Sequence, residues 1–308
     1  MAFVYENITY PSLNEFLMEE TGANAPTFKN RLEFAHRADS KTIQTLESSH
    51  ITSAANRFVE AMVSERYGVM LSTGITVDPV GYPAVYSILE DCCKVLKIPV
   101  PHTIITNGMN TINAMAIGTD NFGFIVLSDL NLRLLSLEEN KFIIGHECGH
   151  IAMGHIVYHS LGHFIGSLGM LIPIIGDAIA KTISLPLNAW SRCSEITADR
   201  AGMVCCKDLK TAQRTLIKIV AGFTDISEKN IDDYIQQSRE SLDVHYVGTY
   251  HEFFMSHPLI PKRLEALELF AASEMYYRVA GIPRPHDVTL LTDEQLNEKV
   301  NHVMKIMN

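Results

Sequence analysis

Hydrophobic side chains recur along most of the chain at the spacing of an amphipathic helix. This pattern predicts a long helix that begins near Ile43 and ends near Gly68. A second helix is expected to begin at Pro83 and to stop before Pro99. The same spacing predicts further helices over residues 13–20, 208–223, 227–242, 259–279 and 293–307.

The spacing changes between residues 103 and 127. Short runs rich in isoleucine, valine and phenylalanine, at 103–106, 112–117 and 122–127, are typical of three short strands. Turn residues lie between the last two runs, which we therefore expect to pair as a hairpin. Many helices and few strands predict a mainly α-helical α+β fold with a small antiparallel sheet.

A helix that carries candidate chemistry is expected to begin at Leu137, because Ser136 and Glu139 have the spacing of a capping box. This helix contains His146-Glu147-Cys148-Gly149-His150. Residues four apart are separated by about 40° around a helix axis, so the two imidazoles can bind one cation. Glu147 lies beside them and can reach a metal-bound water. This is the H-E-x-x-H arrangement of zinc hydrolases.

A catalytic zinc usually has three protein ligands, so a further ligand is needed. His155 would point to the opposite side of an unbroken helix and cannot join without a helix break. Met153 and Ile156 occupy the positions where the metzincin pattern has glycine and histidine. Glu195 and Asp199 are again four apart, so one can ligate the metal while the other accepts a hydrogen bond from a ligand imidazole. A solvated acidic face is the alternative for this pair.

Together these residues resemble the HtpX and CAAX-prenyl-protease type of gluzincin metallopeptidase. The resemblance covers residues 82–267 and also includes three strand-like segments and a His-Pro element followed by arginine. The matching segments are His146–His150, Glu195-x-x-Ala198-Asp199, Ile98–Pro101, Ile112–Ala116, Phe124–Ser128 and Ser256-His257-Pro258 with Arg263. It implies a zincin-like domain, with the small sheet packed on the H-E-x-x-H helix, and one Zn²⁺ per chain.

The resemblance also implies a role for each residue of the motifs. His146, His150 and Glu195 would hold the zinc, and Asp199 would orient a ligand histidine. Glu147 would take a proton from the attacking water and pass it toward the leaving amine. The implied activity is that of a zinc-dependent metalloendopeptidase that cuts extended polypeptides.

In the resembled family the strand with Asn113, Ala114, Met115 and Ala116 is a sheet edge to which substrate adds as a further strand. The alternative is that these are ordinary small core residues. His257 would lie near the cleft, where it could stabilise the oxyanion or reversibly occupy the open zinc position. A helix-capping or core role for His257 is equally open.

A second class of function uses the same residues without cleavage. A catalytically inactive, zinc-containing polypeptide-binding or chaperone-like module would need the cleft and the strand edge. Pure binding does not need a carboxylate beside two ligands, so Glu147 favours the enzyme. A purely structural zinc is disfavoured, because structural sites usually have four ligands and favour cysteine.

Composition narrows the partners and the compartment. The 308 residues carry a net charge of −10, which argues against nucleic-acid binding. The resemblance implies a peptide or unfolded protein as the substrate. No secretory signal is expected, and the six cysteines lack the spacing of a disulfide framework or a C-x-x-C zinc site. These features favour the cytoplasm, with membrane association as the alternative; the oligomeric state stays open.

The organisation expected along the chain has three parts. Residues 1–80 form an N-terminal helical extension, 81–280 the zincin-like domain and 281–308 a C-terminal helix. The apolar stretch 161–187 is interrupted by Pro173 and by charged residues. A spanning helix needs about 20 apolar residues, so we expect a buried or interfacial helical hairpin there rather than a membrane contact.

Overall fold

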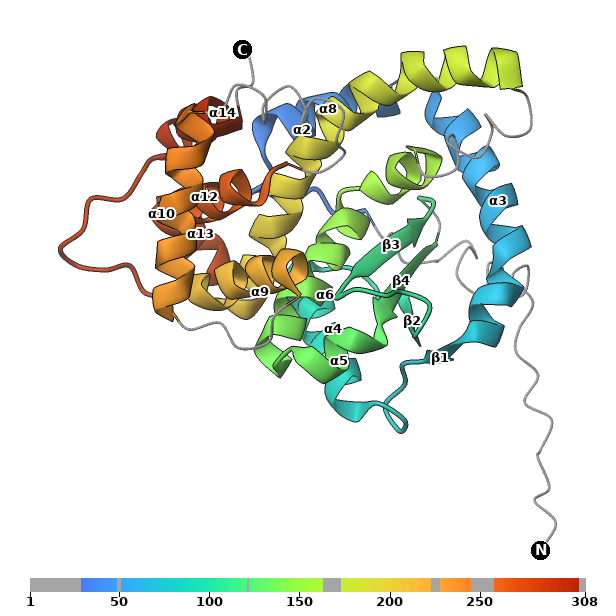
Figure 1. The fold of residues 1–308 in the computed structure, drawn as a ribbon, viewed down its shortest axis with the longest axis horizontal. Coiled ribbons are helices and arrows are strands. Elements are labelled where there is room, and N and C mark those ends of the chain that lie inside the picture. Colours follow the sequence, from blue (N-terminus) through green and yellow to red (C-terminus); the bar gives the residue numbers. More distant parts are fainter. Residues whose placement is uncertain are drawn as a thin grey trace, which may run out of the picture.

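The computed structural model describes residues 29–48, 51–120, 122–162, 173–222, 228–244 and 258–304. Helix α6 lies between the sheet on one side and α8 and α9 on the other (Figure 1). The largest hydrophobic core forms where α4, α6, α8 and the sheet meet. The helices are α2 (Arg37–Glu47), α3 (Ile51–Thr73), α4 (Pro83–Leu96), α5 (Asp129–Leu134), α6 (Leu137–Ala152), α8 (Pro173–Cys206), α9 (Leu209–Ala221), α10 (Glu228–Val244), α12 (Ile260–Ala271), α13 (Glu274–Ala280) and α14 (Asp293–Met304).

The sheet has four strands in the order β1-β2-β4-β3. The predicted hairpin between β3 and β4 is confirmed, and β1 pairs antiparallel with β2. The expectation of a purely antiparallel sheet is wrong, because β2 and β4 run parallel. After β2 the chain crosses to the far edge to form β3 and then returns between them as β4. The strands are β1 (Gly74–Thr76), β2 (His102–Thr106), β3 (Ala114–Gly118) and β4 (Gly123–Ser128).

Two predicted long helices are each divided in the structure. The helix expected from Ile43 to Gly68 consists of α2 and α3, and α3 continues to Thr73. The helix expected over 259–279 consists of α12 and α13. Ser273 separates them, and its side chain accepts a hydrogen bond from the Tyr276 N–H to cap α13. The apolar spacing continues across both breaks, so it does not reveal them. The helix expected over 13–20 lies outside the described residues.

Several local predictions are confirmed. Helix α6 begins at Leu137, and Ser136 and Glu139 form the reciprocal capping box. Thr292 and Gln295 form a second one before α14. All six cysteines are free and buried, as expected for thiols in the core.

The apolar stretch 161–187 is described only in part, because residues 163–172 lie outside the described ranges. From Pro173 the chain is helical and continues unbroken to Cys206, so this segment is the beginning of α8. Within the described ranges, no helix combines the length and the apolar character needed to cross a membrane.

Helices α6 and α8 approach each other closely because both have small residues where they cross. A Cβ atom added to Gly149 would lie only 2.6 Å from the Cβ of Ala201, and one added to Gly202 would lie 2.6 Å from the carbonyl oxygen of Phe142. Real Cβ atoms do not approach other atoms so closely, so the glycines permit the backbone contact. The crossing brings the acidic residues of α8 against the histidines of α6.

We expect Gly149→Ala to lower the free energy of unfolding by about 1–3 kcal/mol, because the new methyl group overpacks the crossing. Alanine is the better helix former by about 1 kcal/mol, so the loss would not come from helix propensity. Ala201→Gly removes the opposing methyl group, and Gly149→Ala/Ala201→Gly should recover most of the loss. Urea denaturation of the metal-free proteins measures these differences. Equal losses in the single and the double variant would contradict the steric explanation.

Candidate metal centre

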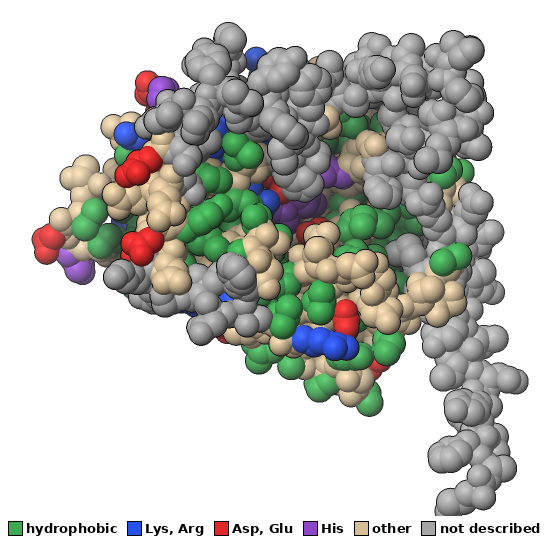
Figure 2. Space-filling view, viewed as in Figure 1, with side chains coloured by type: hydrophobic (Ala, Val, Ile, Leu, Met, Phe, Trp, Pro, Cys, Tyr) green, Lys and Arg blue, Asp and Glu red, His purple; other side chains and the backbone are tan. Residues whose placement is uncertain are grey.

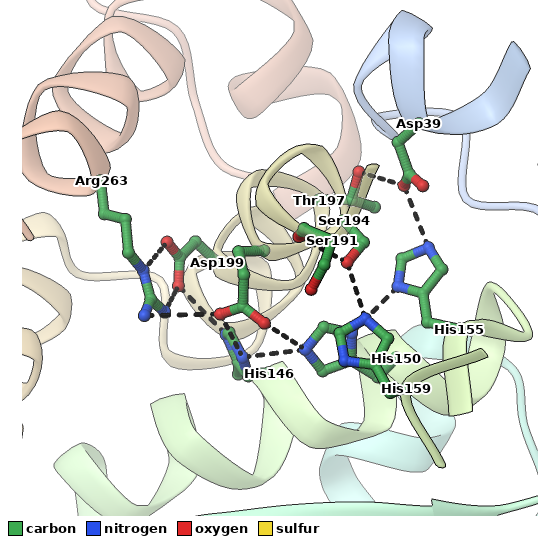
Figure 3. Close-up of polar contacts among 11 residues, drawn as sticks. Asp39, His146, His150, His155, His159, Ser191, Ser194, Thr197, Asp199 and Arg263 are labelled. Atoms are coloured by element: carbon green, nitrogen blue, oxygen red, sulfur yellow. Dashed lines mark hydrogen bonds and ion pairs between the residues drawn. The ribbon is translucent and has the colours of Figure 1, made fainter. Parts of the chain in front are cut away.

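Three buried side chains from two helices converge on one point. His146 and His150 lie one turn apart on α6 (Figure 3). Glu195 of α8 faces both imidazoles. The two Nε2 atoms are 3.1 Å apart. The Glu195 carboxylate oxygens lie 3.5 Å from Nε2 of His146 and 3.2 Å from Nε2 of His150. These three residues are the predicted metal ligands, and the fold brings all of them together.

The spacing of these atoms fits a metal ion. Zinc binds histidine nitrogen at about 2.0–2.1 Å, so two ligand atoms of a tetrahedral site are about 3.3 Å apart. The three separations, 3.1, 3.2 and 3.5 Å, lie around that value. The donor set of two imidazoles and one carboxylate is also a common one for catalytic zinc. Four facing atoms from three side chains are therefore spaced to hold a cation between them.

The imidazole of His146 is oriented from behind by Asp199. Its Nδ1 lies 3.0 Å from Oδ1 of Asp199, so Nδ1–H donates and Nε2 presents its lone pair to the other ligand atoms. Burial alone would raise the pKa of Asp199, but Arg263 and His146 outweigh burial and hold it below its usual value. Asp199 is therefore placed as a hydrogen-bond acceptor behind the His146 ring.

Arg263 of α12 contacts both acidic residues of α8, Asp199 and Glu195. It donates to both carboxylate oxygens of Asp199, at 2.8 and 2.6 Å, and its Nη1 lies 3.4 Å from Glu195. The arginine is only 7% exposed. With neutral histidines, the carboxylates of Glu195 and Asp199 exceed this guanidinium by one negative charge. That excess negative charge favours a cation at the ligand atoms.

Glu147 is buried beside the ligand atoms but is not one of them. Its carboxylate accepts a hydrogen bond from the Ala116 N–H on β3. Burial raises the pKa of Glu147 to about 7, although His146 opposes the shift. Its position, between the metal ligands and a sheet edge, suits proton transfer rather than ligation.

His146, Glu195 and Glu147 line one cavity of about 450 Å³. Figure 2 shows histidine and acidic side chains in a hollow that hydrophobic side chains surround. The hydrophobic lining comes from α6, α9, α10 and α12 and includes Phe142, Ile143, Leu216, Ile219, Tyr234 and Ile260. Such a cavity suits an apolar group held next to the charged centre.

Strand β3 is an edge strand along this cavity. The carbonyl oxygen of Asn113 accepts a hydrogen bond from the Ser128 N–H of β4. The N–H of Ala114 donates to the side chain of Asn113, and the N–H of Ala116 donates to Glu147. Because main-chain groups alternate along a strand, those of Ala114 and Ala116 face away from β4 and those of Met115 face toward it. Of the four predicted substrate residues, Asn113 and Ala114 line the cavity.

Residues 82–271 match the family model of Peptidase family M48. This match covers more than half of the chain. The chain belongs to peptidase family M48. A relative, the plastoglobule-localized metallopeptidase 48, chloroplastic, of Arabidopsis thaliana, is 24% identical over 214 residues, which is 67% of this chain. The match spans 62% of that relative's length, and no solved structure matches the chain.

Membership of family M48 confirms the family that the motifs indicated. The sequence motifs gave Arg263 no role beyond its place in the His-Pro element and left His155 outside the metal centre. Asp39 of α2, whose carboxylate lies 3.0 Å from His155, belongs to no sequence motif. His257 lies outside the described residues, although the adjacent Pro258 lines the cavity.

A helix end explains why His155 lies near this M48 centre. Helix α6 ends at Ala152, and Gly154 has a φ of +73°, in the left-handed region that glycine adopts readily. The chain therefore turns, and Nδ1 of His155 comes within 3.0 Å of Nδ1 of His150. Gly154 was the sequence signal for this turn, because glycine commonly follows the last helical turn.

We expect Arg263→Met to lower the free energy of unfolding of the metal-free protein by about 3–5 kcal/mol, because it leaves two buried carboxylates without their counter-charge. Arg278→Met is the matched control. Arg278 pairs with Asp293 at the surface, where an ion pair contributes at most about 1 kcal/mol. Urea denaturation compares the two. A loss in Arg263→Met no larger than in the control would contradict the role of Arg263 as counter-charge.

Proposed function

We propose that this M48 protein is a zinc-dependent endopeptidase that hydrolyses peptide bonds in extended polypeptides. The observation that carries the proposal is the position of Glu147. Its carboxylate lies in the cavity with His146 and Glu195 and accepts a hydrogen bond from the Ala116 N–H on the edge strand. A base is therefore held between a metal-binding set and a surface that can pair with a peptide main chain.

His146, His150 and Glu195 would hold the zinc, and Asp199 fixes the tautomer of His146. When bound, zinc would polarise a carbonyl oxygen and acidify a water molecule. Glu147 takes the proton of the attacking water and passes it to the departing amine. The hydrogen bond from the Ala116 N–H keeps the carboxylate of Glu147 next to the main chain of a substrate on β3.

The substrate class follows from the surfaces around Glu147. The N–H groups of Ala114 and Ala116 already donate within the chain, but the main-chain carbonyl groups of these residues also face outward from β3. An extended peptide can therefore add to the sheet by donating to these carbonyls, with little regard to its sequence. The hydrophobic cavity beside the ligand atoms would take a large apolar side chain next to the cleaved bond. A polypeptide that is unfolded, or has an exposed extended segment, meets both requirements.

A binding or chaperone-like module with zinc but without cleavage is the other candidate. It would account for the cavity and the strand edge. Binding without cleavage does not explain why the buried carboxylate of Glu147 contacts the edge strand and is not a metal ligand. Membership of a peptidase family also favours the enzyme.

Glu147→Gln keeps the shape of the side chain and removes the base, so casein hydrolysis should fall by a factor of about 10² or more while zinc stays bound. The control is Glu138→Gln, an exposed glutamate on α6, which should leave hydrolysis unchanged. Cut sites identified by mass spectrometry should have a large apolar residue beside the bond. Similar rates in Glu147→Gln and the control would exclude Glu147 as the base.

Zinc content tests the ligand set separately. The purified protein should bind about one zinc per chain, and Glu195→Ala should lose most of it, because two histidines alone bind zinc weakly. A chelator should abolish hydrolysis, and added zinc should restore it. Elemental analysis of the dialysed proteins gives the stoichiometry. Full occupancy in Glu195→Ala would remove Glu195 from the ligand set.

A further inference from the structure

A line of buried hydrogen bonds leads from His150 away from the metal ligands to the N-terminal part of the chain. Nδ1 of His150 lies 3.0 Å from Nδ1 of His155, and Nε2 of His155 lies 3.0 Å from Oδ2 of Asp39 (Figure 3). Asp39 and His155 are both 0% exposed, so water cannot replace either contact. Asp39 belongs to α2, which precedes the segment 82–271 matched by the family model.

The partners of Asp39 define it as an ionised acceptor. Trp190 donates to its Oδ1 at 2.9 Å, and Thr197 and His155 both contact its Oδ2, at 2.6 and 3.0 Å. Burial alone would raise the pKa of Asp39, but His155, Thr197 and Trp190 outweigh burial and hold it below its usual value. A buried carboxylate with three hydrogen-bond donors is satisfied in its charged form.

The positions of the ring protons on His155 and His150 can be assigned by starting from Asp39. Because Asp39 accepts, Nε2 of His155 carries a hydrogen. If that is the one proton on the ring, as it is in a neutral imidazole, Nδ1 of His155 is an acceptor. Nδ1 of His150 must then donate to it. Nε2 of His150 is left with its lone pair, which faces Glu195 and His146. The line therefore selects the one tautomer of His150 that can ligate a metal from its position on α6.

The two ligand histidines are thus oriented from opposite sides of the centre. Asp199, held by Arg263, orients His146. We propose that Asp39 and His155 are positioning residues that orient His150, so that α2 sets the affinity of the metal centre. This inference rests on the metal site of the proposed function. Hydrogen-bond partners of ligand histidines typically change metal affinity by about 10–100-fold.

A second metal ion held by His150, His155 and His159 is the competing arrangement, because ligand atoms of these three lie within 4.8 Å of one another. His150 would then have to lose both ring protons to bridge two ions. The hydrogen-bonded line needs only neutral rings with one proton each. Nε2 of His159 is hydrogen-bonded to Oγ of Ser194, at 2.9 Å. The Ser194 hydroxyl in turn donates to the carbonyl oxygen of Ser191. The single-site arrangement therefore accounts for the contacts with ordinary protonation states.

The test is the affinity of the full-length, metal-free protein for Zn²⁺, measured by competition with a chromophoric chelator. We expect Asp39→Asn and His155→Ala to bind zinc about 10–100-fold more weakly than wild type. Because Asp39 acts through His155, the double variant should be no weaker than His155→Ala alone. The control is Glu47→Gln, a carboxylate-to-amide change on the same helix that breaks surface ion pairs with Lys29 and Arg31; its affinity should equal that of wild type.

His155→Asn separates orientation from folding. The asparagine Oδ1 can take the place of Nδ1 and accept from His150, so this variant should regain part of the affinity lost in His155→Ala. The visible spectrum of the Co²⁺-loaded protein should change in His155→Ala and partly return in His155→Asn. If Asp39→Asn does not fold, as judged by circular dichroism, the two His155 variants decide the question.

The outcomes separate this inference from the proposed function. Wild type that binds no zinc would overturn the proposed function itself. Wild type that binds one zinc, with folded Asp39 and His155 variants within about twofold of its affinity, would overturn the positioning role alone. Two zinc ions per wild-type chain, with the second lost in His155→Ala, would also overturn it, because His155 would then be a ligand.

Discussion

Helices α6 and α8 cross where Gly149 and Ala201 allow their backbones to come into close contact. The ligand atoms come from both helices, so their separations depend on the distance between the two axes. The carboxylate of Glu195 lies 3.2 Å from His150 at the present spacing. A larger residue at the crossing would move the carboxylate away from both imidazoles. The small residues at the crossing therefore set the separation of the ligand atoms.

The crossing also puts charges in the core, where an uncompensated charge is costly. Arg263 compensates Asp199 on one side, while His155, Thr197 and Trp190 satisfy Asp39 on the other. These compensating groups come from helices outside the α6–α8 pair as well as from α8 itself. The metal centre and the packing of the chain's N- and C-terminal parts therefore stabilise each other.

The sequence predicted the features that depend on neighbours along the helix. The capping box at Ser136 and the H-E-x-x-H face follow from helical spacing, and the fold brings the pair on α8 to that face. The parallel pairing of β2 and β4 depends on strand order, which local patterns do not contain. The contact between Asp39 and His155 spans 116 residues and could not be read from spacing. The predicted domain limits and the role of His257 remain predictions.

Helix α8 connects the two sides of the centre because it contributes residues to both. Glu195 and Asp199 lie on the face toward α6, whereas Trp190 and Thr197 lie on the face toward Asp39. Glu195 and Thr197 are two residues apart, which is about 200° around the helix. A rotation of α8 would thus disturb a ligand and the group that orients the opposite ligand at the same time. The metal centre therefore requires a single orientation of α8, which the glycine crossing and the buried carboxylate contacts fix together.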